Sequence, residues 1–414
     1  MKKSVFAGLV VFGASAVSGL AQSGMQEPMP TPSRVVVTNT MPAPQPQKAT
    51  IPAPQPKPIV VGQTPQASQG SNLTYKGLSF AQIKSKMAEA KRMLQTRPLT
   101  TASAEPVVFT SLVRIAYYDV KDKRIDSVVM VKDQFLMPGV QTMLISANGR
   151  QVINRTIRGN GVNTPVVITD MNGEAHLPLI VQYPRETNGQ LTEMAYYAST
   201  HPGLVTPEVV SAGRFYVHNV IEIARDQLRN KGYFIQPKIA DIAERLATVE
   251  HVDHLRFRTE FHPNIYNDIF TLYALNEGQT YRYSVSSAGA GGMVQMIPPT
   301  YRLVRSRFPN AALMPDFVEG MRNHVNATQA MLLYMQMTWN DLAASPTVQD
   351  ALATGIAKQE QLMAAGYNSN PAKLPGYINR GGSDWTNLIP RETKIYLQIW
   401  DSLTNAVAMP PRKL

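Results

Sequence analysis

The chain has 414 residues, no cysteine and a formal net charge of +11 at pH 7. That length can bury the cores of two or three domains. The lack of cysteine excludes disulfides, thiolate metal ligands, a thiol nucleophile and a lipid anchor on cysteine. The 40 Lys and Arg residues are scattered without a long basic run. We therefore expect no nucleic acid among the partners and favour an acidic envelope polymer or anionic lipid.

Residues 1–21 have the pattern of a secretory signal peptide. Lys2-Lys3 precede an apolar run that begins at Val5, and small residues stand three and one positions before a cleavage site after Ala21. An uncleaved anchor is the alternative, because the apolar run is nearly long enough to span a bilayer. We expect an exported protein in the periplasm or cell envelope.

Residues 22–75 are rich in Pro, Gln, Ala, Ser and Thr, as in the segments 41–46 and 52–58. Such a composition buries too little apolar surface to offset the entropy of ordering, and its prolines favour extended conformations. The sequence predicts a disordered linker.

Residues 76–98 are predicted to form an amphipathic helix. Apolar side chains recur at spacings of three and four, at Phe80, Ile83, Met87, Ala90 and Leu94. We expect this stripe to pack on the domain that follows, and the alternative is a partner helix.

Residues 105–200 are predicted to form an antiparallel β-rich accessory domain, a small sandwich or barrel. Three Asn-Gly pairs, at 148–149, 172–173 and 188–189, each separate strand-like segments, and Asn-Gly is the strongest short hairpin signal. No catalytic constellation occurs here, so we expect a role in binding a partner or the wall, or in supporting the next domain. His176 has no second ligand nearby, which favours packing over metal binding.

Residues 206–414 are predicted to be mostly helical, with helices over 209–229 and 237–252. The fold class is therefore α+β and multidomain. Two interpretations fit the cluster that follows the second helix, a metal site or a solvated helix end: Glu250, His251, Asp253 and His254. A histidine pair without a distant third ligand favours the helix end, so we expect no metal and no cofactor.

Glu277 is the candidate catalytic residue. It follows apolar residues at helical spacing, namely Ile265, Ile269, Leu272, Tyr273 and Leu275. Glu277 is therefore expected at the carboxyl end of a mostly buried helix. Apolar surroundings and the helix carbonyls both favour the protonated carboxyl group, which protonation of a glycosidic oxygen requires.

The segment from Glu277 to Tyr301 resembles the soluble lytic transglycosylase (goose-type lysozyme-like) family, whose pattern is E-S, seven residues, then S-x-x-G-A-x-G-L-M-Q-x-x-P-x-T. The matching positions after the glutamate are Ser286, Gly289-Ala290, Gly292, Gln295 and Pro298. Residues 365–371 resemble the family's A-Y-N-x-G-P segment, and residues 389–396 resemble its L-P-x-E-T-x-x-Y segment. The departures are Gly278 in place of Ser, Met293-Val294 in place of Leu-Met, and an inserted Gly366.

The resemblance implies a lysozyme-like helical domain with one catalytic carboxylate. By that resemblance, Glu277 protonates the oxygen between N-acetylmuramic acid and N-acetylglucosamine, and then takes the proton of the 6-hydroxyl to leave a 1,6-anhydro end. No Asp or Glu lies between Glu277 and Asp316, whereas ordinary glycosidases need a second carboxylate. A distant residue such as Asp384 remains an alternative second acid.

The resemblance also assigns substrate-binding roles to Ser286, Met293, Gln295, Tyr367, Asn368 and Glu392. Tyr281, Tyr283 and Tyr301 are candidates for stacking on sugar rings. Structural alternatives stay open, since the serine could cap a turn, Tyr367 could be a core tyrosine, and Glu392 could be a helix-start carboxylate.

These expectations combine into an exported peptidoglycan lytic transglycosylase, with glycan strands as its partner. A tethered enzyme with an accessory domain is typical of local wall remodelling for an envelope-spanning machine. The alternative is a non-catalytic, peptidoglycan-binding component of a secretion or conjugation system.

Overall fold

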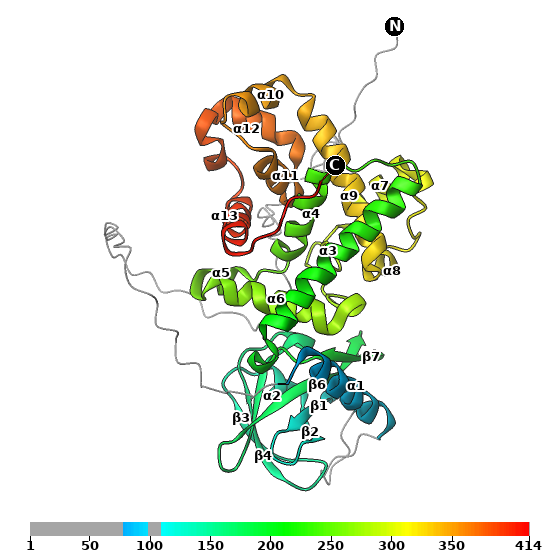
Figure 1. The fold of residues 1–414 in the computed structure, drawn as a ribbon, viewed down its shortest axis with the longest axis vertical. Coiled ribbons are helices and arrows are strands. Elements are labelled where there is room, and N and C mark those ends of the chain that lie inside the picture. The colour runs from blue at the N-terminus through cyan, green and yellow to red at the C-terminus, as the bar shows by residue number, and fades with distance from the viewer. Residues whose placement is uncertain (1–77, 98–108, 414) are drawn as a thin grey trace, which may run out of the picture. The chain divides into compact units, whose positions relative to one another are not determined.

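The computed structural model describes residues 78–97 and 109–413. The predicted signal peptide and linker lie outside the described residues. The described chain divides after Leu204 into an antiparallel β unit and a helical unit (Figure 1). The α+β, two-part fold class is thereby confirmed. In the part of the chain that is described, no helix is both long and apolar enough to cross a membrane.

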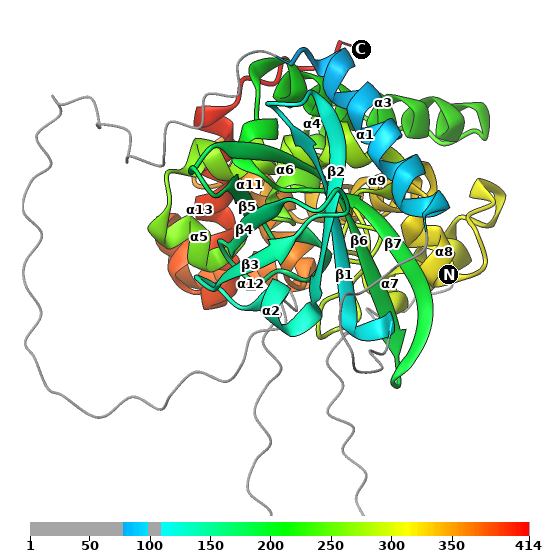
Figure 2. The ribbon, with the colours of Figure 1, turned by 90° about the horizontal axis from the view of Figure 1, so that it is seen from below.

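The β unit is built on one seven-stranded antiparallel sheet (Figure 2). Its order is β2-β1-β6-β5-β4-β3, and β7 pairs with β6 beside that path. The backbone N–H of Ala147, after β3, donates to Ser127 of β2 at 2.8 Å, so the two ends of the sheet approach each other as in a half-barrel. The strands are β1 (Leu112–Asp119), β2 (Arg124–Val131), β3 (Gln141–Ile145), β4 (Gln151–Thr156), β5 (Val166–Asp170), β6 (Ala175–Thr187) and β7 (Gln190–Ala198).

Strand β6 is the centre of this unit. It pairs with β5 near its start, with β1 in its middle and with β7 over its second half. Helix α1 (Phe80–Thr96) packs on β6 and β1 through the predicted apolar stripe, whose members Ile83, Met87, Ala90 and Leu94 are buried. A capping box between Ser79 and Gln82 begins the helix. The amphipathic pattern thus correctly predicted both the helix and its buried face.

The three Asn-Gly pairs form three hairpin turns, as predicted. Only Asn188-Gly189 has both residues at positive φ, 52° and 75°, which is the condition for a type I′ turn. In the other two turns only the glycine is left-handed, with φ of 79° at Gly149 and 83° at Gly173. The hairpin predictions are confirmed, but the single turn type assumed for all three is wrong, because the other two loops are longer.

His176 is packed in the core of the β unit. It is 2 % exposed, its ring stacks on Tyr117 with centroids 5.2 Å apart, and its Nδ1 is 3.7 Å from the Asp119 carboxylate. Within residues 78–97 and 109–413, no group of three His, Asp or Glu side chains could hold a metal ion.

The helical unit has a core made by its long helices, in which α3 packs on α6, α9 and α4. Proline at the first turn begins α3, α4 and α6, where a missing N–H costs nothing. The helices are α3 (Pro207–Asn230), α4 (Pro237–Val249), α5 (His254–Thr259), α6 (His262–Asn276), α7 (Pro298–Arg307), α8 (Phe317–Arg322), α9 (His324–Ala343), α10 (Pro346–Ala353), α11 (Gln359–Asn368), α12 (Leu374–Gly381) and α13 (Arg391–Ala406). Single turns η4 (Glu277–Gln279) and η7 (Gly382–Asn387) follow α6 and α12.

Helices α3 and α6 cross at unusually close range. A Cβ added at Gly213 of α3 would lie 1.8 Å from the carbonyl oxygen of Phe270 in α6, so only glycine fits there. One turn later, Tyr216 stacks on Tyr273 with centroids 6.2 Å apart. The crossing therefore delivers Tyr216 to the carboxyl end of α6.

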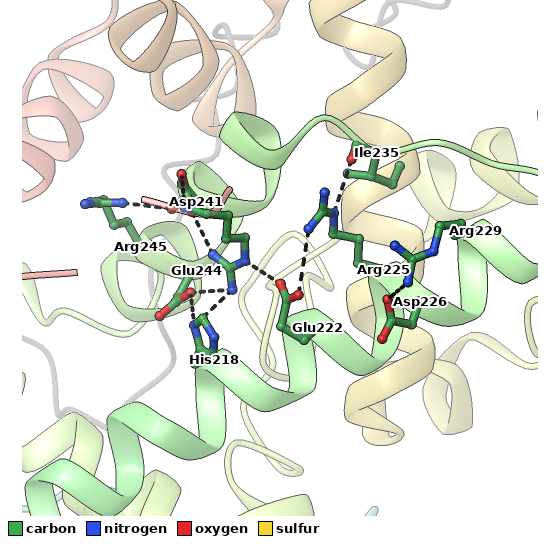
Figure 3. A network of polar contacts seen from close by, with 10 residues as sticks. His218, Glu222, Arg225, Asp226, Arg229, Ile235, Asp241, Glu244 and Arg245 are labelled. Carbon is green, nitrogen blue, oxygen red and sulfur yellow. Dashed lines mark hydrogen bonds and ion pairs between the residues drawn. The ribbon is translucent and has the colours of Figure 1, made fainter. Parts of the chain in front are cut away.

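The C-terminal tail is tied to α3 and α4 by Arg412. Figure 3 shows Glu222 of α3, with Asp241 and Glu244 of α4, in one polar network. The Arg412 guanidinium bonds Glu222, lies 2.9 Å from Asp241 and 2.5 Å from Glu244, and contacts His218 at 3.2 Å. Burial alone would lower the pKa of Arg412, but these three carboxylates outweigh burial and raise it.

Candidate functional site

Glu277 occupies the turn that ends helix α6. Its backbone N–H donates to Tyr273, and its φ of 45° and ψ of −127° lie in a region that glycine normally occupies. Holding a residue with a side chain in such a conformation costs about 1–3 kcal/mol, and residues of this kind cluster at functional sites. The sequence correctly placed Glu277 at the end of a buried helix, but it carried no sign of this strain.

The expectation that Glu277 has apolar surroundings is wrong. Glu277 and Gly278 are both exposed, although α6 itself is buried from Ile265 to Ala274. The helix ends at the surface, and the chain turns outward at Glu277. Burial therefore does not favour the protonated carboxyl group in the free protein, and any such preference must come from neighbouring polar groups or from bound substrate.

Two side chains from distant helices lie behind this turn. The Tyr216 hydroxyl of α3 is 2.9 Å from Nδ1 of His324, the first residue of α9. Nε2 of His324 is 2.8 Å from the carbonyl oxygen of Thr280, which follows η4. The Thr280 hydroxyl in turn donates to Leu272 of α6. The turn that carries Glu277 is therefore anchored to α3 and α9.

The loop after this turn, residues 281–297, is a compact fold of its own. Gly291 bridges to both Val285 and Met296. The Ser286 hydroxyl accepts a hydrogen bond from the Ala290 N–H at 3.0 Å, and Ser286 is 5 % exposed. Its turn-capping role is thus observed. A Cβ at Gly292 would lie 2.3 Å from the Met321 carbonyl of α8, so glycine allows the loop to rest on that helix.

Met293 and Gln295 face inward. Met293 is fully buried and Gln295 is 4 % exposed. The Gln295 amide donates to the Gly292 carbonyl at 2.8 Å and to the Ser284 hydroxyl at 3.2 Å. These residues support the shape of the loop from within, whereas the sequence interpretation gave them a sugar-facing wall.

Two side chains hold the backbone of this loop from outside. Nε2 of His251 is 2.9 Å from the Met293 carbonyl, and the His251 ring stacks on Tyr281 at 3.3 Å. The Tyr367 hydroxyl of α11 donates to the Val294 carbonyl at 2.7 Å. His251 therefore belongs to the framework of the loop. Tyr367 makes the single satisfied hydrogen bond of the structural alternative.

The third motif block joins the second through one side-chain contact. The Thr393 hydroxyl of α13 donates to Asn368 of α11 at 2.9 Å. Glu392, half-buried, lies in the first turn of α13, as the helix-start alternative describes. Because Tyr367 also bonds the loop, the structure brings all three motif blocks into one continuous region.

The sequence interpretation missed three residues and misplaced others. Tyr216 and His324 carry no local signal, since only the packing of α3 against α9 brings them together. Glu250, assigned to a solvated helix end, is instead 6 % exposed and accepts a hydrogen bond from Tyr396 at 2.7 Å. Tyr281 and Tyr301 are buried and so present no ring face to a sugar, whereas Tyr283 is half-buried.

Comparisons of the chain with protein-family models, with curated proteins and with solved structures found no match. The resemblance to the lytic transglycosylase family therefore rests on the three motif blocks alone.

Two other candidate sites lie apart from Glu277. A cavity of about 1080 Å³ is lined by residues of α4, α11, α13 and the tail, among them Lys238, Arg245 and Trp400. None of its lining residues belongs to the motif blocks. Asp384, the alternative second acid, is exposed in η7, which packs on α12 at the end of the helical unit away from α6 (Figure 1).

Proposed function

We propose that the protein is an exported peptidoglycan lytic transglycosylase and that Glu277 is its single catalytic acid. One observation carries the proposal: at the motif position of the acid stands a surface glutamate in a strained, glycine-like conformation. A chain that needed only a turn there would be more stable with glycine. The assembly of the three motif blocks around one loop supports the same assignment.

The proposed reaction needs one group that first gives and then takes a proton. Glu277 protonates the oxygen between N-acetylmuramic acid and N-acetylglucosamine as the C1–O bond breaks, and the acetamide of the substrate stabilises the cation. The ionised Glu277 then accepts the proton of the sugar's 6-hydroxyl while its oxygen bonds C1. The products are a 1,6-anhydro end and a free 4-hydroxyl, and no water is consumed.

In this proposal the domain with Glu277 is lysozyme-like, and its partners are the glycan strands of the wall. The β unit would bind the wall or proteins of an envelope-spanning secretion or conjugation complex. Ser286, Met293, Gln295, Tyr367 and Asn368 would act chiefly by shaping the loop beside the acid.

A non-catalytic, peptidoglycan-binding role is the second candidate. The exposure of Glu277 and the glycine at position 278 favour it, because both weaken the hold on an acid. Such a component would bind the wall and leave it intact.

Digestion of purified sacculi separates the two candidates. The full chain is incubated with sacculi, and the soluble products are analysed by mass spectrometry. Anhydro-muropeptides that are absent with Glu277→Gln and present with the exposed control Glu174→Gln support the enzyme. Water-terminated reducing ends would make the protein a hydrolase, and co-sedimentation with sacculi without products would establish the binding component.

A further inference from the structure

Gly278 removes a hydroxyl that the resembling family places beside the acid. In this chain the vacated space borders another hydroxyl. A Cβ at position 278 would lie 3.8 Å from the Tyr216 oxygen, an ordinary contact distance. Helix α3 therefore presents a hydroxyl to the turn from outside the motif, and the close crossing at Gly213 makes this possible.

The direction of the hydrogen bonds at Tyr216 follows from its partner. His324 is 5 % exposed, and burial lowers its pKa to about 4, so the ring is neutral at neutral pH. Nε2 faces the Thr280 carbonyl oxygen at 2.8 Å, which can only accept, so Nε2 carries the hydrogen. Nδ1 is then a bare acceptor, and the Tyr216 hydroxyl must donate to it.

The charges around Tyr216 can be named from each neighbouring element. From α9 it faces the neutral His324. From α6 it faces Tyr273, whose hydroxyl donates to the Ala247 carbonyl at 2.8 Å. From η4, the charge of Glu277 acts on it. Burial, and then the field of Glu277, raise the pKa of Tyr216, so the phenol keeps its hydrogen, which remains directed at His324.

We propose that Tyr216 and His324 form a positioning pair that favours the protonated form of Glu277. The Tyr216 oxygen can accept a hydrogen bond from a carboxyl group, but its own hydrogen is committed to His324 and is not offered to a carboxylate. Because Glu277 is exposed, burial does not supply this preference, and the pair supplies it instead. The inference rests on the proposed role of Glu277 as general acid.

The same arrangement serves the second half of the proposed reaction. Once Glu277 has given its proton to the leaving group, its carboxylate faces an oxygen lone pair with no hydrogen to stabilise it. The carboxylate is then better able to take the proton of the 6-hydroxyl. One fixed pair thus assists both proton transfers.

The test that does not depend on activity is an NMR titration of the Glu277 carboxyl carbon in the full chain. Its signal is assigned by its loss in Glu277→Gln. In Tyr216→Phe the titration midpoint should fall by about 0.7 pH unit, the shift that a neutral hydrogen bond of about 1 kcal/mol produces at 1.36 kcal/mol per unit. Tyr266→Phe, on α6 and bonded to the Ile399 carbonyl, is the control and should leave the midpoint unchanged. A midpoint that stays or rises in Tyr216→Phe overturns the pair.

The second test uses the pH profile of sacculus digestion. The alkaline limb of kcat/KM should move to lower pH by the same amount in Tyr216→Phe, with KM unchanged. A wild-type chain that forms no anhydro products, yet shows the NMR shift, would refute the enzyme and keep the pair. An active wild-type chain whose midpoint and alkaline limb are both insensitive to Tyr216→Phe would refute the pair and keep the enzyme.

Discussion

Replacing Glu277 by glycine should stabilise the helical unit. The φ of 45° and ψ of −127° at this position suit glycine, and holding a side chain there costs about 1–3 kcal/mol. Against this gain, the greater freedom of glycine in the unfolded chain costs about 0.4–1 kcal/mol. Glu277→Ala removes the carboxylate but keeps the Cβ and its strain. We therefore expect Glu277→Gly to exceed Glu277→Ala by about 1 kcal/mol in free energy of unfolding.

Urea denaturation followed by tryptophan fluorescence measures this difference. All three tryptophans, Trp339, Trp385 and Trp400, belong to the helical unit, so the signal reports on that unit. Ala288→Gly is the matched control, since Ala288 is exposed in the neighbouring loop and has no positive φ. Glycine should cost about 0.4–1 kcal/mol there.

The sign of the effect decides the outcome. If Glu277→Gly proves less stable than Glu277→Ala by an amount similar to the loss at Ala288, then position 277 carries no strain. The structural support for a retained catalytic acid would then be lost. A stabilised Glu277→Gly that also forms no anhydro products would show stability exchanged for function.

Four further outcomes follow from the packing of the helical unit. Gly213→Ala should lower the free energy of unfolding by about 3 kcal/mol in urea denaturation, because its methyl group meets α6 backbone at 1.8 Å; an unchanged transition would mean that the helices can separate freely. Tyr396→Phe should cost about 1–3 kcal/mol, since it leaves the buried Glu250 carboxylate without that hydrogen bond; a loss below 0.5 kcal/mol (~) would contradict this. Arg412→Ala should cost about 3–5 kcal/mol by leaving three carboxylates together, and exposed Arg391→Ala is its control. The pKa of His324 is about 4 when folded and about 6.5 when unfolded, so its stabilisation is complete above pH 6.5 (~). Roughly 3 kcal/mol of it should be lost between those two pH values, and His324→Gln should abolish this slope in urea midpoints.

Local sequence signals predicted the local structure well. The apolar stripe of α1, the three hairpins and the helix that ends at Glu277 all depend on neighbours within a few residues. Periodicity and turn chemistry record such neighbours directly. The antiparallel unit and the helical unit could therefore be separated from the sequence.

The surroundings of the candidate acid could not be predicted in the same way. Tyr216 and His324 are 108 residues apart, and only the close crossing of α3 and α6 brings them to the turn. Periodicity showed that α6 is buried, but it could not show that the chain leaves the core at Glu277. For the same reason, Gln295 and Tyr367 matched motif positions while their hydrogen bonds, to the loop itself, remained hidden.

The contacts of Arg412 make the order of synthesis matter to the helical unit. Glu222, Asp241 and Glu244 are translated long before the arginine that neutralises them. Until residue 412 is present, α3 and α4 hold three carboxylates that repel one another. A chain shortened by a premature stop or by proteolysis would keep that repulsion, so the tail acts as a check that the chain has been made to that point.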